Sequence, residues 1–208
     1  MHKEKIPKTT IYRLALYLRT LEKVAREKKV FISSQEMGKL CGVDSAQLRK
    51  DLSYFGQFGE VGRGYNVSIL ITNLKKILKL HRRVWKVALA GVGHLGTALL
   101  SYRGFREAGF DICCAFDSDP QKIGKKIQRV KIYSHKKMRE VILKHRIKIG
   151  IIAVPPESAP DVAEKMVSAG VKALLNFAPV RLSFSSSVIV KNVDLSTELL
   201  SLPFYLKC

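Results

Sequence analysis

The sequence Gly91-Val92-Gly93-His94-Leu95-Gly96 decides the fold of the second half of the chain. An apolar run at residues 86–90 leads into it, and residues 97–103 have the composition of a helix. Glycines at the three spaced positions permit a tight turn, a close pyrophosphate and a helix packed on its strand. The phosphates would lie at the N-terminus of that helix, where free N–H groups and the helix dipole favour anions. The motif therefore predicts a Rossmann-type dinucleotide site.

Asp117 specifies the expected ligand of this site. It closes a second apolar run, residues 112–116, about 20 positions after Gly96, where the motif places the carboxylate that holds the adenosine ribose. A carboxylate there accepts from a 2′-hydroxyl and repels a 2′-phosphate, so NAD(H) is favoured over NADP(H). Val154 ends another expected strand and Pro155 follows it, and both should line the same pocket.

The charge of the chain requires an anionic partner or a solvated surface. Among 208 residues, 37 are Lys or Arg and 17 are Asp or Glu, which gives a net charge of +20. Eleven basic residues fall within positions 121–148, where Glu140 is the only acidic residue. A lysine-rich solvated surface and attraction to a polyanion both explain such an excess, and charge alone does not separate them.

Composition also bears on the compartment of the protein. No apolar stretch approaches the ~18–20 residues of a membrane span, so no membrane partner is expected. The first residues lack the apolar region of a signal peptide. Cys41, Cys113, Cys114 and Cys208 show no metal-ligand spacing, so no metal site is predicted. These features are typical of a cytoplasmic protein with reduced cysteines.

The N-terminal residues predict a helix-turn-helix. A first helix is indicated by an apolar stripe at helical spacing, made of Ile11, Leu14, Leu18, Leu21 and Ala25. Ser33 and Glu36 form a capping box that begins a helix through Leu40. After a glycine turn at residues 41–43, Asp44 and Gln47 repeat the pattern and begin a helix through Leu52.

The second of these short helices has a free polar face. Leu48 and Leu52 are expected to face the core, which leaves other side chains to point outward: Ser45, Gln47, Arg49 and Lys50. Arg and Gln can read guanine and adenine, whereas Lys and Ser more often contact phosphate. The following residues, 55–65, combine four glycines with aromatics and predict a β-hairpin wing with Arg63 near its tip, suited to a narrow minor groove. A small helical packing domain with an incidental basic face is the alternative.

The expected architecture is α/β with two domains. A winged-helix domain, 1–66, and a linker helix, 67–85, precede a Rossmann domain, 86–193, and a C-terminal helix, 194–208. Strands are expected near residues 86–90, 111–116, 130–133, 148–154, 171–176 and 187–191, with helices near 94–103, 135–146 and 158–169. The terminal helix is apolar over much of its surface and needs a partner to cover it, which favours a dimer.

Catalytic residues are not assembled near the glycine turn. The histidines are scattered, and the loop after residue 154 offers no acid or base before Glu157, which we interpret as a charge at a helix N-terminus. A cofactor pocket without a catalytic set indicates a sensor rather than an enzyme.

Several segments together resemble the Rex family of redox-sensing transcriptional repressors. The resemblance rests on residues 45–56 with Gly64-Tyr65, on the glycine turn and on five later segments: Tyr102-Arg103-Gly104-Phe105, Phe116-Asp117, Ala153-Val154-Pro155, Asn176-Phe177-Ala178-Pro179 and Asn192-Val193-Asp194-Leu195. It implies a homodimer of winged-helix and Rossmann domains whose C-terminal helices are exchanged. Such repressors sense the NADH/NAD+ ratio, binding double-stranded operator DNA at low NADH and leaving it when NADH binds.

The resemblance also implies roles for individual residues. Arg49 and Lys50 would contact the major groove, and Arg13 would contact the DNA near its backbone; Tyr54 belongs to the same DNA-binding segment. Arg19 would pair with Asp194 between the domains in one state, and Tyr102 would lie beside the nicotinamide.

Some residues depart from the family pattern. Glu60-Val61 replaces a basic pair on the wing, which Arg63 would partly restore, and His94 replaces the usual Arg or Asn of the glycine turn. Two alternatives therefore stay open besides the NADH-responsive repressor. One is a divergent relative that binds DNA without responding to NADH, and the other is a nicotinamide-dependent enzyme with a basic N-terminal arm.

Overall fold

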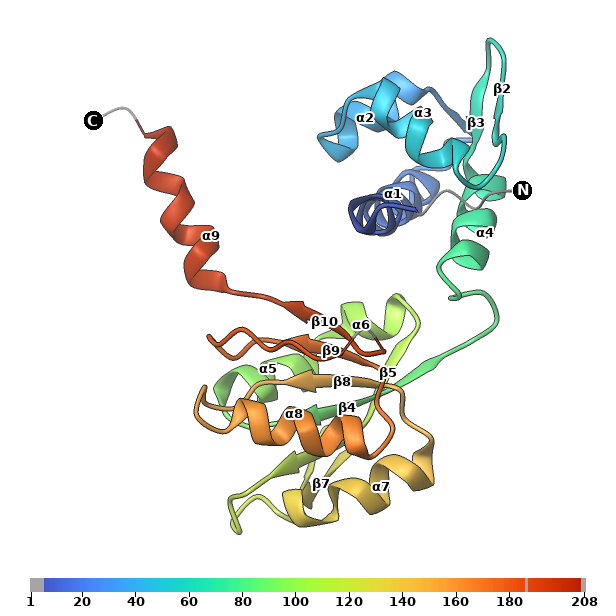
Figure 1. The fold of residues 1–208 in the computed structure, drawn as a ribbon. Coiled ribbons are helices and arrows are strands. Elements are labelled where there is room, and N and C mark those ends of the chain that lie inside the picture. Colours follow the sequence, from blue (N-terminus) through green and yellow to red (C-terminus); the bar gives the residue numbers. More distant parts are fainter. Residues whose placement is uncertain (1–5, 186, 207–208) are drawn as a thin grey trace. The chain divides into compact units, whose positions relative to one another are not determined.

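The chain divides into two compact units, Met1–Arg83 and Val84–Cys208. The computed structural model describes residues 6–185 and 187–206 of the chain. The first unit is mainly helical and the second is built on a parallel sheet, so the predicted α/β class with a winged helix and a Rossmann domain is confirmed (Figure 1). Cys208 lies outside the described residues; Cys41, Cys113 and Cys114 are free thiols.

The N-terminal unit is a winged helix. Its elements, in chain order, are α1 (Lys8–Arg26), β1 (Phe31–Ile32), α2 (Ser34–Cys41), α3 (Ser45–Ser53), β2 (Gly59–Glu60), β3 (Gly64–Asn66) and α4 (Val67–Ile77). The three strands form one antiparallel sheet in the order β1-β3-β2, and the turn between β2 and β3 is the tip of the wing.

The first helix buries a stripe that differs slightly from the expected one. Leu14, Leu18 and Leu21 are buried as predicted, whereas Ile11 is 40% exposed and Ala25 is also exposed. Thr10 and Tyr17 are buried in addition, because both donate hydrogen bonds to a buried carboxylate of α3. This polar contact turns the buried face of α1 away from Ile11 and Ala25.

Both predicted helix N-caps are confirmed by hydrogen bonds from backbone N–H groups to the capping side chains. The Ser33 hydroxyl accepts the N–H of Glu36, and the Asp44 carboxylate accepts the N–H groups of Ala46 and Gln47. Between the helices, Gly42 has a φ of 63°, the left-handed conformation that glycine adopts without strain. Leu48 and Leu52 are buried, which leaves the opposite face of α3 exposed as predicted.

The helix expected as a linker belongs to the N-terminal unit. In α4, Val67, Leu70 and Leu74 are buried in the same apolar cluster as Leu14 and Leu48. The helix ends at Ile77, and the division between the units falls at Arg83. The apolar face of α4 docks on α1, so residues 67–77 are part of the winged helix rather than a separate connection.

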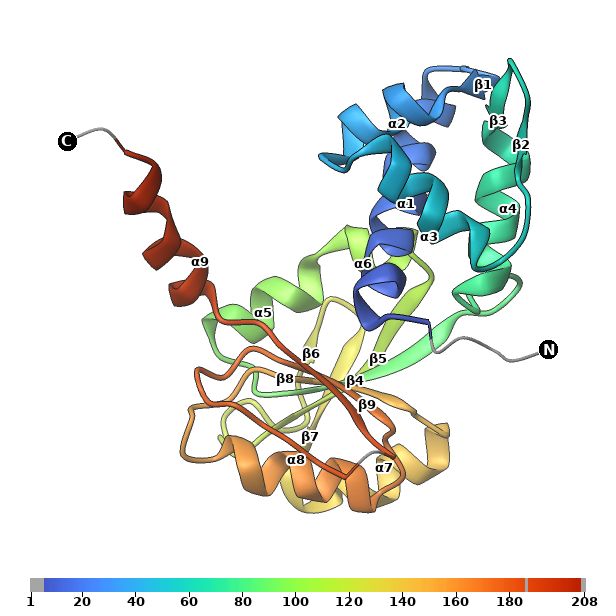
Figure 2. The same ribbon diagram turned by 45° about the horizontal axis from the view of Figure 1, so that its top comes forward.

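The C-terminal unit is a sheet with helices on both faces. Its elements are β4 (Trp85–Ala90), α5 (His94–Ser101), α6 (Arg103–Glu107), β5 (Phe110–Asp117), β6 (Lys126–Ile127), β7 (Val130–Ser134), η1 (His135–Lys137), α7 (Met138–His145), β8 (Ile149–Ile152), α8 (Ala159–Ser168), β9 (Ala173–Asn176), β10 (Ile189–Asn192), α9 (Leu195–Ser201) and η2 (Leu202–Tyr205). The strand order is β10-β9-β8-β4-β5-β7-β6, and every pairing is parallel except that of β6 with β7. In both views α7 and α8 cover one face of the sheet, while α5 and α6 cover the other (Figure 2).

All six expected strands occur, but two expected helices are interrupted. The helix predicted near 94–103 breaks at Tyr102, whose ψ of 105° is extended, into α5 and α6. The terminal helix ends at Ser201 and continues as the 3-10 helix η2, which contains Pro203. Within the described ranges, no helix has both the length and the apolar composition that a bilayer crossing requires.

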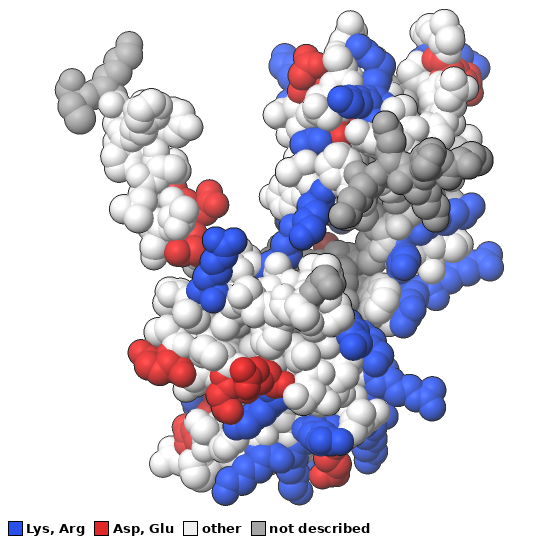
Figure 3. All heavy atoms as spheres, in the orientation of Figure 1, with Lys and Arg blue, Asp and Glu red and all other residues white. Residues whose placement is uncertain are grey.

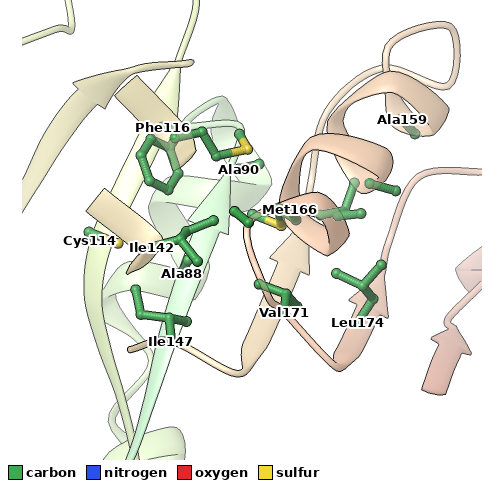
Figure 4. Packing of buried hydrophobic residues seen from close by; sticks show 14 of the residues in the cluster. Ala88, Ala90, Cys114, Phe116, Ile142, Ile147, Ala159, Met166, Val171 and Leu174 are labelled. Atoms are coloured by element: carbon green, nitrogen blue, oxygen red, sulfur yellow. The ribbon is translucent and has the colours of Figure 1, made fainter. Parts of the chain in front are cut away.

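Small residues let the helices approach the sheet on the α7–α8 face. Ala88 and Ala90 of β4 and Cys114 of β5 are buried beneath Ile142 and Met166, which come from the two helices (Figure 4). This packing holds the carboxyl ends of β4, β5 and β8 side by side, where the glycine turn and Asp117 lie.

Candidate nucleotide pocket and nucleic-acid interface

The glycine turn connects β4 to α5 as predicted, and each glycine has its own geometric reason. Gly91 has a φ of 90°, and a Cβ there would lie 2.3 Å from the carbonyl oxygen of Ala153. A Cβ on Gly96 would lie 2.0 Å from the carbonyl oxygen of Gly91, so only glycine lets α5 start this close to the strand. A Cβ on Gly93 would meet nothing within 4 Å, and Gly93 lines an open pocket.

Asp117 is fixed at the carboxyl end of β5 by hydrogen bonds from two loops. Its Oδ2 accepts the N–H of Val92 at 2.8 Å, and its Oδ1 accepts the N–H of Asp119 at 2.9 Å. The Nζ of Lys122 lies 3.5 Å from Oδ2. Burial by itself raises the pKa of Asp117, but the two N–H groups and the Lys122 charge together lower it below its usual value. The carboxylate is therefore ionised at neutral pH.

A pocket of about 500 Å3 opens between these loops. Of the predicted cofactor residues, six line it: Gly91, Val92, Gly93, Asp117, Val154 and Pro155. His94, Leu95 and Gly96 do not, because α5 begins at His94 and carries these residues away from the opening; His94 is exposed. Further wall residues that the sequence did not indicate include Lys122, His135, Ser158, Asp161 and Lys165.

His135 carries an unusual polar atom in this wall. Its Nδ1 is buried and has no hydrogen-bond partner among the residues that the structure describes. A buried polar atom without a partner is costly, so a bound group with a complementary donor or acceptor would recover that free energy. No motif in the sequence distinguishes His135 from the other scattered histidines.

Tyr102 lies in a different cavity, which is larger. This cavity of about 750 Å3 is lined by α5, α6 and the start of β5, including Leu99, Phe105 and Asp111. It contains no residue of the glycine turn, so the smaller pocket is the candidate nucleotide site. The ring of Tyr102 is half exposed and packs edge-on against Phe105 with centroids 5.1 Å apart.

A buried carboxylate organises the N-terminal unit. Asp51 of α3 is fully buried, and each of its oxygens accepts several hydrogen bonds. The donors are the Thr10 hydroxyl at 3.0 Å, Arg13 Nη2 at 2.7 Å and Nε at 2.5 Å, the Tyr17 hydroxyl at 2.8 Å and Gln47 Nε2 at 2.9 Å. Burial alone raises the pKa of Asp51, but these donors, Arg13 first, outweigh it and lower the pKa to about 2.

This network changes the expected surface of α3. Gln47 was expected to point outward and Arg13 to contact DNA, yet both side chains are bound to Asp51 and are partly buried. Arg49 and Lys50 remain exposed. Arg49 Nη1 donates to the hydroxyls of Ser34 at 3.0 Å and Ser45 at 3.4 Å, which orients its guanidinium along the exposed face. Tyr54, at the C-cap of α3, is half-buried.

The wing has a mixed charge. Arg63 lies in the turn between β2 and β3, and its Nη1 is 3.4 Å from the Glu60 carboxylate. The guanidinium also stacks over the Phe31 ring at 4.8 Å from the centroid. Val61 is fully exposed at the tip. Glu60 thus offsets part of the positive charge that Arg63 brings to the wing.

Arg19 and Asp194 belong to different units, and their pairing stays a prediction. Asp194 caps α9 by accepting the N–H groups of Ser196 at 3.0 Å and Thr197 at 3.3 Å. The Thr197 hydroxyl also donates to this carboxylate, and these bonds lower the pKa of Asp194.

A winged helix with an exposed basic helix face, joined to a Rossmann unit with a nucleotide pocket, defines a ligand-responsive DNA-binding regulator. Known proteins agree with this class. The family model described as "CoA binding domain" matches residues 82–180, and the model described as "Putative DNA-binding protein N-terminus" matches residues 5–53.

Individual relatives identify the family to which the chain belongs. The redox-sensing transcriptional repressor Rex of Pelotomaculum thermopropionicum is 50% identical over 202 residues, covering 97% of this chain and 94% of that protein. The Rex of Carboxydothermus hydrogenoformans is 48% identical, covering 98% and 97%. The chain belongs to the Rex family of redox-sensing transcriptional repressors.

Solved structures extend the likeness to the whole fold. The Rex-family repressor RSP in complex with β-NAD+ and operator DNA is 36% identical, with a TM-score of 0.90 over 97% of this chain and 93% of that one. RSP in complex with β-NADH has a TM-score of 0.87 at 35% identity, covering 97% and 94%.

Proposed function

We propose that this chain is a repressor that binds operator DNA through α3 and the wing and is released when NADH occupies the Rossmann pocket. The observation that carries the proposal is the combination of two sites on one chain. Arg49 and Lys50 are exposed on a helix whose N-terminus is capped by Asp44, and Asp117 is hydrogen-bonded to the glycine turn in the other unit. The RSP complexes with operator DNA and with NADH support the same pairing of ligands.

On the DNA side, α3 acts as the recognition helix. Arg49 can donate two parallel hydrogen bonds to a guanine edge, and its bonds to Ser34 and Ser45 hold it ready at little entropic cost. Lys50 and Ser45 contact bases or phosphates beside it, and Arg63 enters the minor groove. Arg13 acts mainly through Asp51, because its guanidinium is committed to that carboxylate.

On the nucleotide side, the ionised Asp117 accepts from the adenosine ribose and excludes a 2′-phosphate, which selects NAD(H). The N-terminus of α5 receives the pyrophosphate above Gly93. His135 offers its buried Nδ1 to a polar edge of the adenine. The nicotinamide extends toward Val154 and Pro155, and Tyr102 serves as the switch residue next to it, as the family resemblance implies.

We infer a regulatory rather than a catalytic role for the pocket. The loop after β8 carries Val154, Pro155 and Pro156, which have no group that could transfer a proton, and Glu157 is exposed beyond them. A dehydrogenase would need an acid or base in reach of the nicotinamide. Because operator DNA is the proposed partner, we place the protein in the cytoplasm.

The active form is proposed to be a homodimer with exchanged C-terminal helices. Seven apolar side chains of α9, η2 and the residue after them are 54–87% exposed: Leu195, Leu199, Leu200, Leu202, Phe204, Tyr205 and Leu206. A second copy would cover this surface and bring Asp194 to Arg19. Two recognition helices then meet successive major grooves, about 34 Å apart.

The test replaces the exposed pair on α3. With a duplex selected from a randomised library by the wild-type chain, Arg49→Ala/Lys50→Ala should weaken binding at least 100-fold in fluorescence anisotropy, because bidentate base contacts are worth about 1–3 kcal/mol each. NADH binding, measured by calorimetry, should not change.

The matched control, Lys23→Ala/Lys76→Ala, removes two exposed charges from α1 and α4 of the same unit and should weaken DNA binding only slightly. Equal losses in both variants would show that charge alone, and not α3, binds the duplex. Unchanged DNA binding in the α3 variant, with NADH still bound, would favour an enzyme with a basic arm.

A further inference from the structure

The C-terminal unit carries a basic surface that neither the operator site nor the nucleotide pocket uses. Eight exposed cations lie between the β6–β7 hairpin and the end of α7, and we call them the basic edge: Lys125, Lys126, Lys131, Lys136, Lys137, Arg139, Lys144 and Arg146. The basic side chains of this unit gather along its lower and right-hand border in Figure 3.

These cations are not neutralised within the described part of the chain. None of the eight has a carboxylate oxygen within 4 Å there, whereas neighbouring Lys122 and Arg129 pair with Asp117, Asp119 and Asp111. The Nζ of Lys131 lies 5.3 Å from the centroid of the Tyr133 ring, and this cation–π contact leaves the positive charge of Lys131 in place.

Two local arrangements on the basic edge are unfavourable without an anion. Lys126 and Lys131 are directly opposite each other in the antiparallel β6–β7 pair, where like charges destabilise the hairpin. Lys136, Lys137 and Arg139 stand at the start of α7, the end of a helix whose dipole disfavours cations. An external polyanion would relieve both repulsions at once.

The side chains around the basic edge indicate which polyanion fits. Between residues 121 and 148 the only aromatic side chain besides the imidazoles is Tyr133, which is half-buried beneath Lys131. Single-stranded nucleic acids are held by bases stacked on exposed aromatic rings, and this surface offers none. Leu143 is the one large apolar side chain exposed among them, too little to insert into a membrane. A regular array of phosphates, as on a duplex, requires only charge.

We propose that the basic edge is a second DNA-binding surface, which contacts the phosphate backbone of duplex DNA without reading sequence. It acts independently of α3 and of the nucleotide. It supplies affinity for DNA of any sequence, and this affinity persists when NADH releases the operator.

The experiment measures salt dependence on DNA that lacks an operator. All proteins carry Arg49→Ala/Lys50→Ala, which removes the contribution of α3, and a labelled 30-bp duplex of scrambled sequence is titrated from 50 to 300 mM KCl. Lys126→Gln/Lys131→Gln/Lys136→Gln should reduce the slope of log K against log[KCl] by about 2 to 3, because each lost phosphate contact removes about 0.9.

The control removes the same number of charges elsewhere on the same unit. Lys86→Gln/Lys172→Gln/Lys191→Gln, three exposed lysines, should change the slope by less than about 1. Thermal unfolding should show the basic-edge variant at least as stable as its parent, because it removes the Lys126–Lys131 repulsion.

Equal slopes in the two triple variants would overturn the proposal. A single-stranded RNA of equal length, or vesicles of phosphatidylserine and phosphatidylcholine, bound more tightly than the duplex would overturn it as well. The outcome is separate from the proposed repressor function, since that function is read on the selected duplex with intact α3.

Discussion

The Asp51 carboxylate joins α1 to α3, the helix that we propose reads DNA. Four side chains donate to it, and two of them, Arg13 and Gln47, had been expected at the DNA surface. No local pattern predicts this, because Asp51 and Arg13 are 38 positions apart and neither spacing nor hydropathy encodes the pair. The sequence did predict which apolar residues of α3 are buried, Leu48 and Leu52, since they follow helical periodicity.

The lowered pKa of Asp51 predicts a loss of stability in acid. Its pKa is about 2 in the folded state and about 3.9 in the unfolded chain, so stability is present above pH 4 and is lost as the pH falls toward 2. The loss should reach about 2 to 3 kcal/mol for the N-terminal unit once the pH is below 2, and it is measured from urea unfolding curves recorded by circular dichroism. Asp51→Asn should be less stable at pH 7, because Arg13 loses its counter-charge, and should lack this acid-dependent step. A variant with the full wild-type pH dependence would contradict this role of Asp51.

Asp117 predicts the choice of dinucleotide. Asp117→Asn keeps the size of the side chain but removes the charge, so calorimetry should show NADH binding about 10- to 100-fold weaker, the cost of a charge-assisted hydrogen bond. The ratio of NADH affinity to NADPH affinity should fall, because the variant no longer repels the 2′-phosphate of NADPH. Asp161→Asn is the control, since this pocket-wall carboxylate is exposed and paired with Lys165. Comparable losses in both variants would argue against a specific ribose contact.

At the scale of elements, the sequence predicted long periodic strands and helices better than short or interrupted ones. Six of the seven strands that the structure describes in the Rossmann unit were predicted, because each is an apolar run between turn residues. β1 and β6, two residues each, carry no periodic signal, and the pairing of β1 with β3 is a long-range contact. The break at Tyr102 was missed because residues 94–103 contain no proline, and glycine only where the turn requires it.

The C-terminal helix predicts how the chain associates. Leu199→Ser/Leu200→Ser/Phe204→Ser should convert a dimer to a monomer in light scattering, because these three side chains are 66–87% exposed within one chain. Their replacement should leave the melting of an isolated chain nearly unchanged. Glu198→Gln on the same helix serves as the control. A triple variant that stays dimeric would place the interface elsewhere.

At the scale of the whole molecule, the two units are coupled only if binding of a ligand to one unit changes the affinity of the other unit for its own ligand. Linkage requires that NADH weaken operator binding by the same factor by which the operator weakens NADH binding. We expect a factor of about 5 to 150, the usual range of allosteric coupling, in reciprocal titrations by anisotropy and calorimetry. NADH affinity that is equal with and without saturating operator would rule out the switch and leave two independent sites.

The hydrogen bonds that hold Asp117 bear on which change in the dinucleotide pool this pocket can sense. Val92 and Asp119 fix the carboxylate, which in the proposed complex holds the adenosine half of the dinucleotide, and that half is identical in NAD+ and NADH. NAD+ would then compete with NADH for the same carboxylate. When both forms together saturate the pocket, doubling the total pool changes nothing, and only the exchange of one form for the other alters occupancy. An anchor that does not distinguish the two redox states would in this way make the repressor insensitive to how much dinucleotide the cell contains.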